Sequence, residues 1–147
     1  MTLLCPVDSC TLVASKKHDV PHHECPDCRG GWFDLSEFEE LEASAADAFA
    51  LAGTIEYFPR PAPLDCPVCG KKMDAFDYRG NNLELDACSE EHGFWLSPGV
   101  ADKVRTVMRR RSGDLRNSRI AQRAWDTKRE LGFAPALVDR IRAFFRG

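Results

Sequence analysis

The sequence predicts a small α+β fold that is stabilised by bound metal, contains the same unit twice and ends in a helical C-terminal region. Three observations lead to this prediction. Seven of the 147 residues are cysteines, and most of them stand a few residues apart in pairs. The segment around the first cysteines recurs about 60 residues later in the chain. Apolar residues make up 44% and charged residues 29%, which is typical of a globular chain and not of a disordered one.

Both the beginning and the end of the unit are repeated. Each copy opens on Cys-Pro-Val and later places a tryptophan seven residues after a cysteine, Trp32 after Cys25 and Trp95 after Cys88. We interpret this pattern as a tandem duplication. The predicted parts are a first unit with its helix (1–52), a Pro-rich linker (53–64), a second unit with its helix (65–111) and a basic helical tail (112–147).

Each copy is expected to form a β-hairpin. In the second copy, residues 73–78 and 83–87 read as strands around a turn at 79–82, where Gly and Asn tolerate positive φ. In the first copy, residues 12–15 and 20–24 take the same places. The tryptophan of each copy is expected to fill the small core beneath its own hairpin, because a large ring contributes much of the apolar area that such a core can bury.

A helix is expected after each tryptophan. Asp34 or Ser36 can cap the first helix, with Glu37 in its opening turn. Ser97 followed by Pro98 begins the second helix. Apolar residues then follow at helical spacing: Phe38, Leu41, Ala45, Ala48 and Phe49 in the first helix, and Val100, Val104, Val107 and Met108 in the second.

The C-terminal region differs from the rest of the chain in charge. Residues 1–100 contain 7 basic and 18 acidic residues, whereas residues 101–147 contain 13 basic and 5 acidic residues. The segment 109–113 is expected to break the second helix, with a third helix over 114–131 and a fourth over 136–145. The acidic part and the basic tail can therefore neutralise each other, or each can face a separate partner.

The cysteines are expected to bind zinc. Structural zinc sites use four tetrahedral S or N ligands, and a Cys-x-x-Cys loop presents two thiolates from one tight turn. Two such loops separated by a hairpin of about 20 residues can close around one ion, which is the geometry of a zinc ribbon. Each copy is too small to fold on an apolar core alone, so two structural Zn²⁺ ions are expected, each contributing ~10–16 kcal/mol in apparent terms. The expected ligands are Cys5, Cys10, Cys25 and Cys28 in the first site and Cys66, Cys69, Cys88 and His92 in the second.

Two of these ligands have alternatives. Asp8 holds the direct Cys-x-x-Cys register after Cys5, but thiolate is the better zinc ligand and Cys10 can reach around a wider loop. Glu91 holds that register in the second copy, but imidazole suits a structural zinc site better than carboxylate, which favours His92. Inert buried thiols and redox Cys-x-x-Cys chemistry are disfavoured by the pairing and the repetition.

These residues give the chain a resemblance to the TFIIB-type zinc-ribbon family (zf-TFIIB, transcription factor zinc-fingers). The family pattern is Cys-Pro-x-Cys, a hairpin, then Cys-Pro-x-Cys-x-Gly-x-Trp-Leu-Asp-x-Gly-Glu-Leu. Residues 25–38 follow its second half, and the second copy follows it through 93–96 but departs from it at 97–100. The resemblance covers about 1–45 and 64–108.

The resemblance also bears on the ligands and the function. Family members with Cys-Pro-x-Asp openings keep Asp8 as a candidate ligand, and Cys-x-x-x-His-Gly endings support His92. The family name refers to transcription, but a fold family carries little information about the role of one member.

A binding protein is expected, not an enzyme. Four protein ligands leave a zinc ion no open position for water, and the chain lacks a Ser/His/Asp order, a phosphate loop or a recognisable carboxylate pair. We expect an adaptor that mediates protein–protein interaction or self-association through the ribbons and the C-terminal helices. The alternative is a transcription-related nucleic-acid-binding protein that uses the basic C-terminal helix. The residues for that role are Arg109, Arg110, Arg111, Arg116, Arg119 and Arg123.

A cytoplasmic location without a membrane span is expected. No apolar run approaches the roughly 18 residues that a span needs, and residues 1–11 lack the basic start of a signal peptide. The odd number of cysteines fits reduced thiols that bind metal in the cytosol.

Overall fold

A computed structural model describes residues 2–46 and 58–130. The described residues fall into two compact units, which divide after Ser112. The helix predicted over 136–145 lies outside the described residues, as do Ala48 and Phe49 of the first predicted helix. In the described part, no helix is long and apolar enough to cross a lipid bilayer.

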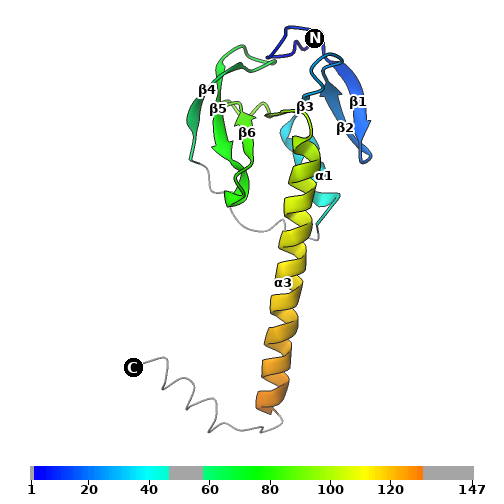
Figure 1. The fold of residues 1–147 in the computed structure, drawn as a ribbon, viewed down its shortest axis with the longest axis vertical. Helices are drawn as coiled ribbons and strands as arrows, with labels where there is room; N and C mark the ends of the chain where they lie inside the picture. Colours follow the sequence, from blue (N-terminus) through cyan, green and yellow to red (C-terminus); the bar gives the residue numbers. More distant parts are fainter. Residues whose placement is uncertain (1, 47–57, 131–147) are drawn as a thin grey trace. The chain divides into compact units, whose positions relative to one another are not determined.

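The first unit is organised by one antiparallel sheet of seven strands (Figure 1). The strand order is β1-β2-β3-β7-β6-β5-β4. What we call the first half (residues 4–44) contributes β1 to β3, and the second half (residues 60–112) contributes β4 to β7. The strands are β1 (Val13–Lys17), β2 (Val20–Glu24), β3 (Gly31–Phe33), β4 (Arg60–Asp65), β5 (Lys72–Asp77), β6 (Glu84–Ala87) and β7 (Phe94–Leu96).

The two halves meet at β3 and β7. These strands pair antiparallel, with Trp32 opposite Trp95 and Gly31 opposite Leu96. The order β1-β2-β3 on one side of this pair is matched by β5-β6-β7 on the other, and only β4 has no counterpart. An approximate two-fold axis therefore passes between the two tryptophans and relates the halves.

The predicted hairpins are confirmed. Strand β2 has the predicted bounds, and β1, β5 and β6 agree with their predictions within two residues. A short 3-10 helix, η1 (Tyr78–Gly80), overlaps the predicted turn, in which Arg79, Gly80 and Asn82 have φ values of 50°, 69° and 55°.

Part of the predicted linker is a strand. Residues Arg60–Asp65 form β4, which pairs with β5 alone and lies at the edge of the sheet. Pro61 and Pro63 lack the N–H that an interior strand must donate, so an edge is where such a strand is tolerated. Proline content alone suggested a connector and concealed this role.

Helix α1 (Leu35–Ala43) begins as predicted. The side chain of Asp34 accepts a hydrogen bond from the Glu37 N–H at 2.8 Å, and the Glu37 carboxylate accepts one from the Asp34 N–H at 2.9 Å. This reciprocal capping box satisfies two backbone donors that the helix leaves without partners. Phe38 and Leu41 then bury the inner face of α1.

Helix α3 (Val100–Glu130) is continuous, so the predicted break at 109–113 and the separate helix over 114–131 are wrong. Arginine is a good helix former, and one interior glycine costs only about 1 kcal/mol relative to alanine. Val104 and Met108 are fully buried and hold the beginning of α3 against the sheet.

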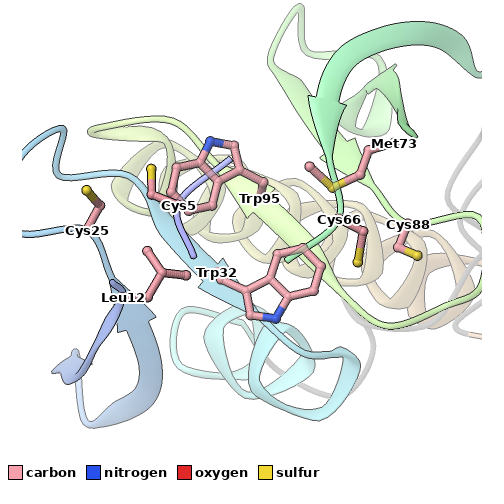
Figure 2. Packing of buried hydrophobic residues seen from close by; sticks show 8 residues of the cluster. All are labelled: Cys5, Leu12, Cys25, Trp32, Cys66, Met73, Cys88 and Trp95. Carbon is pink, nitrogen blue, oxygen red and sulfur yellow. The ribbon is translucent and has the colours of Figure 1, made fainter. Parts of the chain in front are cut away.

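The tryptophans are exchanged between the halves. Trp32 and Trp95 are buried, at 2% and 1% exposure, as expected of core residues. Each ring, however, lies over a glycine of the other half, Trp95 over Gly30 and Trp32 over Gly93. Figure 2 shows the Trp95 ring beside Cys5 and the Trp32 ring toward Cys66. The prediction that each tryptophan fills the core of its own hairpin is therefore wrong, and the halves share one core.

Gly93→Ala is expected to destabilise the first unit by about 1–3 kcal/mol. An added Cβ would collide with the backbone carbonyl of Phe33 and with the Trp32 ring, and φ is 153° at this position. Urea unfolding would measure the loss. Gly80→Ala is the control, because Gly80 also has positive φ (69°) but open space around it. Equal losses in the two variants would show that backbone conformation, and not the contact between halves, limits this position.

Candidate metal centres

Four short loops carry the predicted ligands, and three of them close alike. The cysteine N–H donates to the carbonyl five residues on, and the N–H four residues on donates back to the cysteine carbonyl. The residue four positions after the cysteine has a left-handed φ. This conformation directs the side chain of the preceding residue, three positions after the cysteine, back toward the cysteine. The bonds are Cys5 N to Cys10 O (2.7 Å), Cys25 N to Gly30 O (2.9 Å) and Cys66 N to Lys71 O (2.8 Å), and the left-handed residues are Ser9 (63°), Arg29 (66°) and Gly70 (72°).

The fourth loop keeps the first of these bonds, from the Cys88 N–H to the Gly93 carbonyl at 3.1 Å, but its return bond comes one residue earlier. The Glu91 N–H donates to the Cys88 carbonyl at 3.0 Å, and Glu91 itself has the left-handed φ of 61°. Glu91, three positions after Cys88, therefore lies at the turn itself, and the next residue, His92, faces Cys88. This shift explains why the sequence departs from Cys-x-x-Cys here.

The second site consists of Cys66, Cys69, Cys88 and His92, with all four ligand atoms within 4.8 Å of one another. The Sγ atoms of Cys69 and Cys88 are 3.6 Å apart, and His92 Nδ1 lies 3.4 Å from Cys88 Sγ. A tetrahedral zinc ion with bonds of 2.0–2.3 Å places its ligand atoms about 3.5–3.8 Å apart. The four predicted residues are thus together at a spacing that fits zinc, and the group contains His92 and not Glu91.

The first site consists of Cys5, Asp8, Cys25 and Cys28, again within 4.8 Å. The Sγ atoms of Cys5 and Cys28 are 3.6 Å apart, and an Asp8 carboxylate oxygen lies 3.3 Å from Cys25 Sγ. Asp8 has the position of Cys28 and Cys69 in their loops. The backbone N–H two residues on donates to each side chain: Cys10 N–H to Asp8 at 3.0 Å and Gly30 N–H to Cys28 at 3.4 Å.

The structure places Asp8 with Cys5, Cys25 and Cys28, whereas Cys10 lies in a separate group with Asp8 and Asp27 that could also hold a metal ion. Cys10 occupies the place of Gly30 and Lys71, where the chain has already left the loop. Its thiol donates to the Asp27 carboxylate at 2.7 Å, and that carboxylate raises the pKa of Cys10 to about 12. Ranking the candidates by ligand chemistry missed this geometry, whereas the Cys-x-x-Asp register indicated it.

The loops also shift the pKa values of the ligand side chains. Burial raises the pKa of the Cys5 and Cys66 thiols to about 12. The Lys71 N–H lowers the pKa of Cys69 to about 7, and the Cys10 N–H lowers the pKa of Asp8. Metal ligands must be deprotonated to bind, and backbone N–H groups aimed at them stabilise that form.

The predicted nucleic-acid residues all lie on α3. Arg109, Arg110, Arg116, Arg119 and Arg123 are exposed, and Arg111 is half-buried. Ile120 and Trp125 are exposed on the same helix, at 60% and 56%.

The structure is a small α+β fold with two four-residue groups that could hold metal ions, which is consistent with zinc ribbons. In agreement with this, residues 4–44 match the family described as transcription factor zinc-finger. This match covers the whole first site, Cys5 to Cys28, and helix α1. No curated protein and no solved structure matches the chain.

Proposed function

We propose that the protein binds two structural zinc ions in tandem zinc ribbons and acts as a non-enzymatic adaptor that binds another protein. Two four-ligand groups of similar geometry, one in each half, support the zinc count. Three thiolates with either an imidazole or a carboxylate suit zinc better than magnesium or calcium. We propose no catalytic role, because four protein ligands leave each ion without an open position. Cytoplasmic location stays a prediction.

Asp8→Ala is expected to lower the zinc content from two ions to one after dialysis against a weak chelator, whereas Cys10→Ser keeps both. The reason is that Asp8 faces Cys25 while the Cys10 thiol faces Asp27. Metal content per chain, measured by mass spectrometry, decides between them. Loss of one ion in Cys10→Ser with retention in Asp8→Ala would restore Cys10 as the ligand.

The exposed apolar side chains of α3 carry the adaptor proposal. Ile120 and Trp125 lie among exposed residues over 116–126, where the helix has few buried side chains of its own. Tryptophan and arginine are the residues that most often dominate the binding energy of protein interfaces. Arg116 on the same segment favours a partner with an acidic surface.

A binding comparison tests this role. Zinc-loaded full-length protein and the variant Ile120→Ser/Trp125→Ser would be compared in sedimentation and in chemical crosslinking from cell extract. We expect the double variant to lose its partner, or its self-association, by at least roughly tenfold in affinity. Phe58→Ser is the control, because Phe58 is also exposed, at 77%, but lies outside α3. Unchanged complexes in the double variant would contradict the proposal.

Nucleic acid binding is the second candidate, supported by the exposed arginines of α3 and by Trp125, since an aromatic ring can stack on a base. Fluorescence anisotropy with duplex DNA, single-stranded DNA and RNA at ~50 and ~200 mM salt tests it. The adaptor proposal expects no saturable binding, because residues 1–100 are strongly acidic. Steeply salt-dependent binding that is lost in Arg109→Gln/Arg110→Gln/Arg116→Gln would favour this candidate instead.

A further inference from the structure

A small cavity lies between the first hairpin and the beginning of α3, outside both metal centres. Its volume is about 40 Å³. Lys17, His22, Glu24 and Arg29 line it from the first half, and Ala101 lines it from the first turn of α3. All of these residues belong to the compact unit 1–112.

The cavity follows from a difference between the two halves. Counted from the tryptophans, Ala101 corresponds to Phe38 and Gly31 corresponds to Phe94. The rings of Phe38, in the first half, and Phe94, in the second, pack with centroids 4.4 Å apart. Here the corresponding residues are alanine and glycine, and both line the cavity. An aromatic pair that fills one side of the two-fold axis is thus missing on the other side.

His22 brings a buried polar atom to this space. Its side chain is 3% exposed, and its ring stacks on Phe33 with centroids 4.6 Å apart. Nδ1 lies 3.3 Å from the Val20 carbonyl, so the neutral ring carries its proton there and Nε2 is left as an acceptor. Nε2 is 3.9 Å from Glu24, beyond hydrogen-bond distance. In the described part of the chain, no fully enclosed side-chain N or O lacks a partner, so Nε2 keeps some exposure, and His22 is one of the residues that line the cavity.

Donors surround these acceptors. Lys17 and Arg29 are cationic. In the first turn of α3, Val100 N–H already donates to the Ser97 carbonyl at 3.0 Å and Lys103 N–H to the Gly99 carbonyl at 3.3 Å, which leaves the N–H groups of Ala101 and Asp102 as donors. Asp102 on that turn is already paired with Lys17 at 3.0 Å and with His18 at 2.8 Å. Glu24 accepts from Ser15 at 3.3 Å and from Arg29 at 3.5 Å. The cavity therefore offers an ammonium and a guanidinium donor, each also in contact with a carboxylate (Lys17 with Asp102, Arg29 with Glu24), together with two hydrogen-bond acceptors, His22 Nε2 and the Glu24 carboxylate.

We propose that this cavity binds a protonated phosphate group. Such a group is an anion that also carries a P–O–H donor, so its oxygens can accept from Lys17, Arg29 and the α3 backbone while its hydroxyl donates to His22 Nε2. A carboxylate and a sulfate at neutral pH accept only, and both would leave Nε2 without a donor. This binding site is independent of the adaptor role.

Inorganic phosphate and sulfate distinguish this chemistry, because they share size and shape and differ in the hydroxyl. Titrations of the zinc-loaded full chain at pH 7 and constant ionic strength would be followed by the amide NMR signals of Gly31 and Ala101. Saturable phosphate binding with sulfate at least roughly tenfold weaker is expected, since sulfate leaves a buried acceptor without its hydrogen bond. Equal binding of the two anions, or binding of neither, overturns the proposal.

Three variants locate the site. Ala101→Phe adds the ring that Phe38 provides in the other half and is expected to abolish phosphate binding by filling the cavity. His22→Phe keeps the stack on Phe33, removes the acceptor and is expected to weaken phosphate at least tenfold. Lys17→Ala is expected to weaken it too, with Lys16→Ala on the other face of the same strand as the control.

Thermal unfolding confirms that each variant is folded before it is titrated. If Ala101→Phe fails to fold, His22→Phe and Lys17→Ala carry the test. Phosphate binding that is unchanged in folded His22→Phe and Lys17→Ala would place the anion elsewhere and overturn the assignment.

Discussion

Cys25→Ala is expected to release one zinc ion and to unfold the whole unit 1–112, not only the half that carries the residue. The halves share one core cluster that contains both tryptophans and cysteines from both sites (Figure 2). Cys25 is fully buried in it, on the loop that Trp95 covers at Gly30. A structural zinc contributes ~10–16 kcal/mol in apparent terms, whereas a domain has only about 5–15 kcal/mol of net stability. Loss of one ion therefore exceeds what the second half can supply alone.

Zinc content, amide NMR and tryptophan fluorescence would measure this result. We expect both β2 and β6 to lose their native signals together, and chelator added to the wild-type chain to cause the same single transition. Cys10→Ser is the matched control and is expected to remain folded with both ions bound. A Cys25→Ala variant that keeps native signals for β5 and β6 would show that the second half folds independently.

Glu42→Ala is expected to cost about 3–5 kcal/mol, the second-largest effect. Glu42 lies on α1 in the first half, and its carboxylate accepts from Arg79 Nη2 at 3.0 Å and Nε at 3.2 Å. Tyr78 also donates to it, and burial raises the pKa of Tyr78, which keeps this hydroxyl protonated. The Glu42 and Arg79 side chains are each only 7% exposed, so removing the carboxylate leaves a buried guanidinium without its counter-charge.

Urea unfolding of zinc-loaded protein would measure the loss. Glu39→Ala, on an exposed position of the same helix, is the control and is expected to change stability by less than about 0.5 kcal/mol. The double variant Glu42→Leu/Arg79→Met is expected to recover most of the stability, because replacing a whole buried ion pair by apolar residues is often neutral. A Glu42→Ala variant as stable as Glu39→Ala would mean that the pair does not hold the halves together.

Much of the local structure could be predicted from residues close in sequence. The Gly and Asn turn at 79–82 located β5 and β6 on either side of it, and the Asp34 and Glu37 pair located the start of α1. Seven of the eight expected metal ligands lie in the two four-residue ligand groups, because cysteine spacing depends only on a short loop, and the eighth, Cys10, lies in a smaller group with Asp8 and Asp27. The exception, Cys10, was chosen for its chemical affinity, but the hydrogen bonds of the loop place Asp8 at that position.

The sequence by itself therefore determined the hairpins, the capped helix and the residues that can bind metal, since each depends on interactions a few residues apart. Tertiary structure alone decided how the halves combine. The pairing of Trp32 with Trp95, the ion pair of Glu42 with Arg79 and the cavity beside Ala101 join segments separated by about 35 to 80 residues. Such contacts depend on complementary shapes and charges of surfaces that exist only after the strands have formed, and no periodicity within either half encodes them.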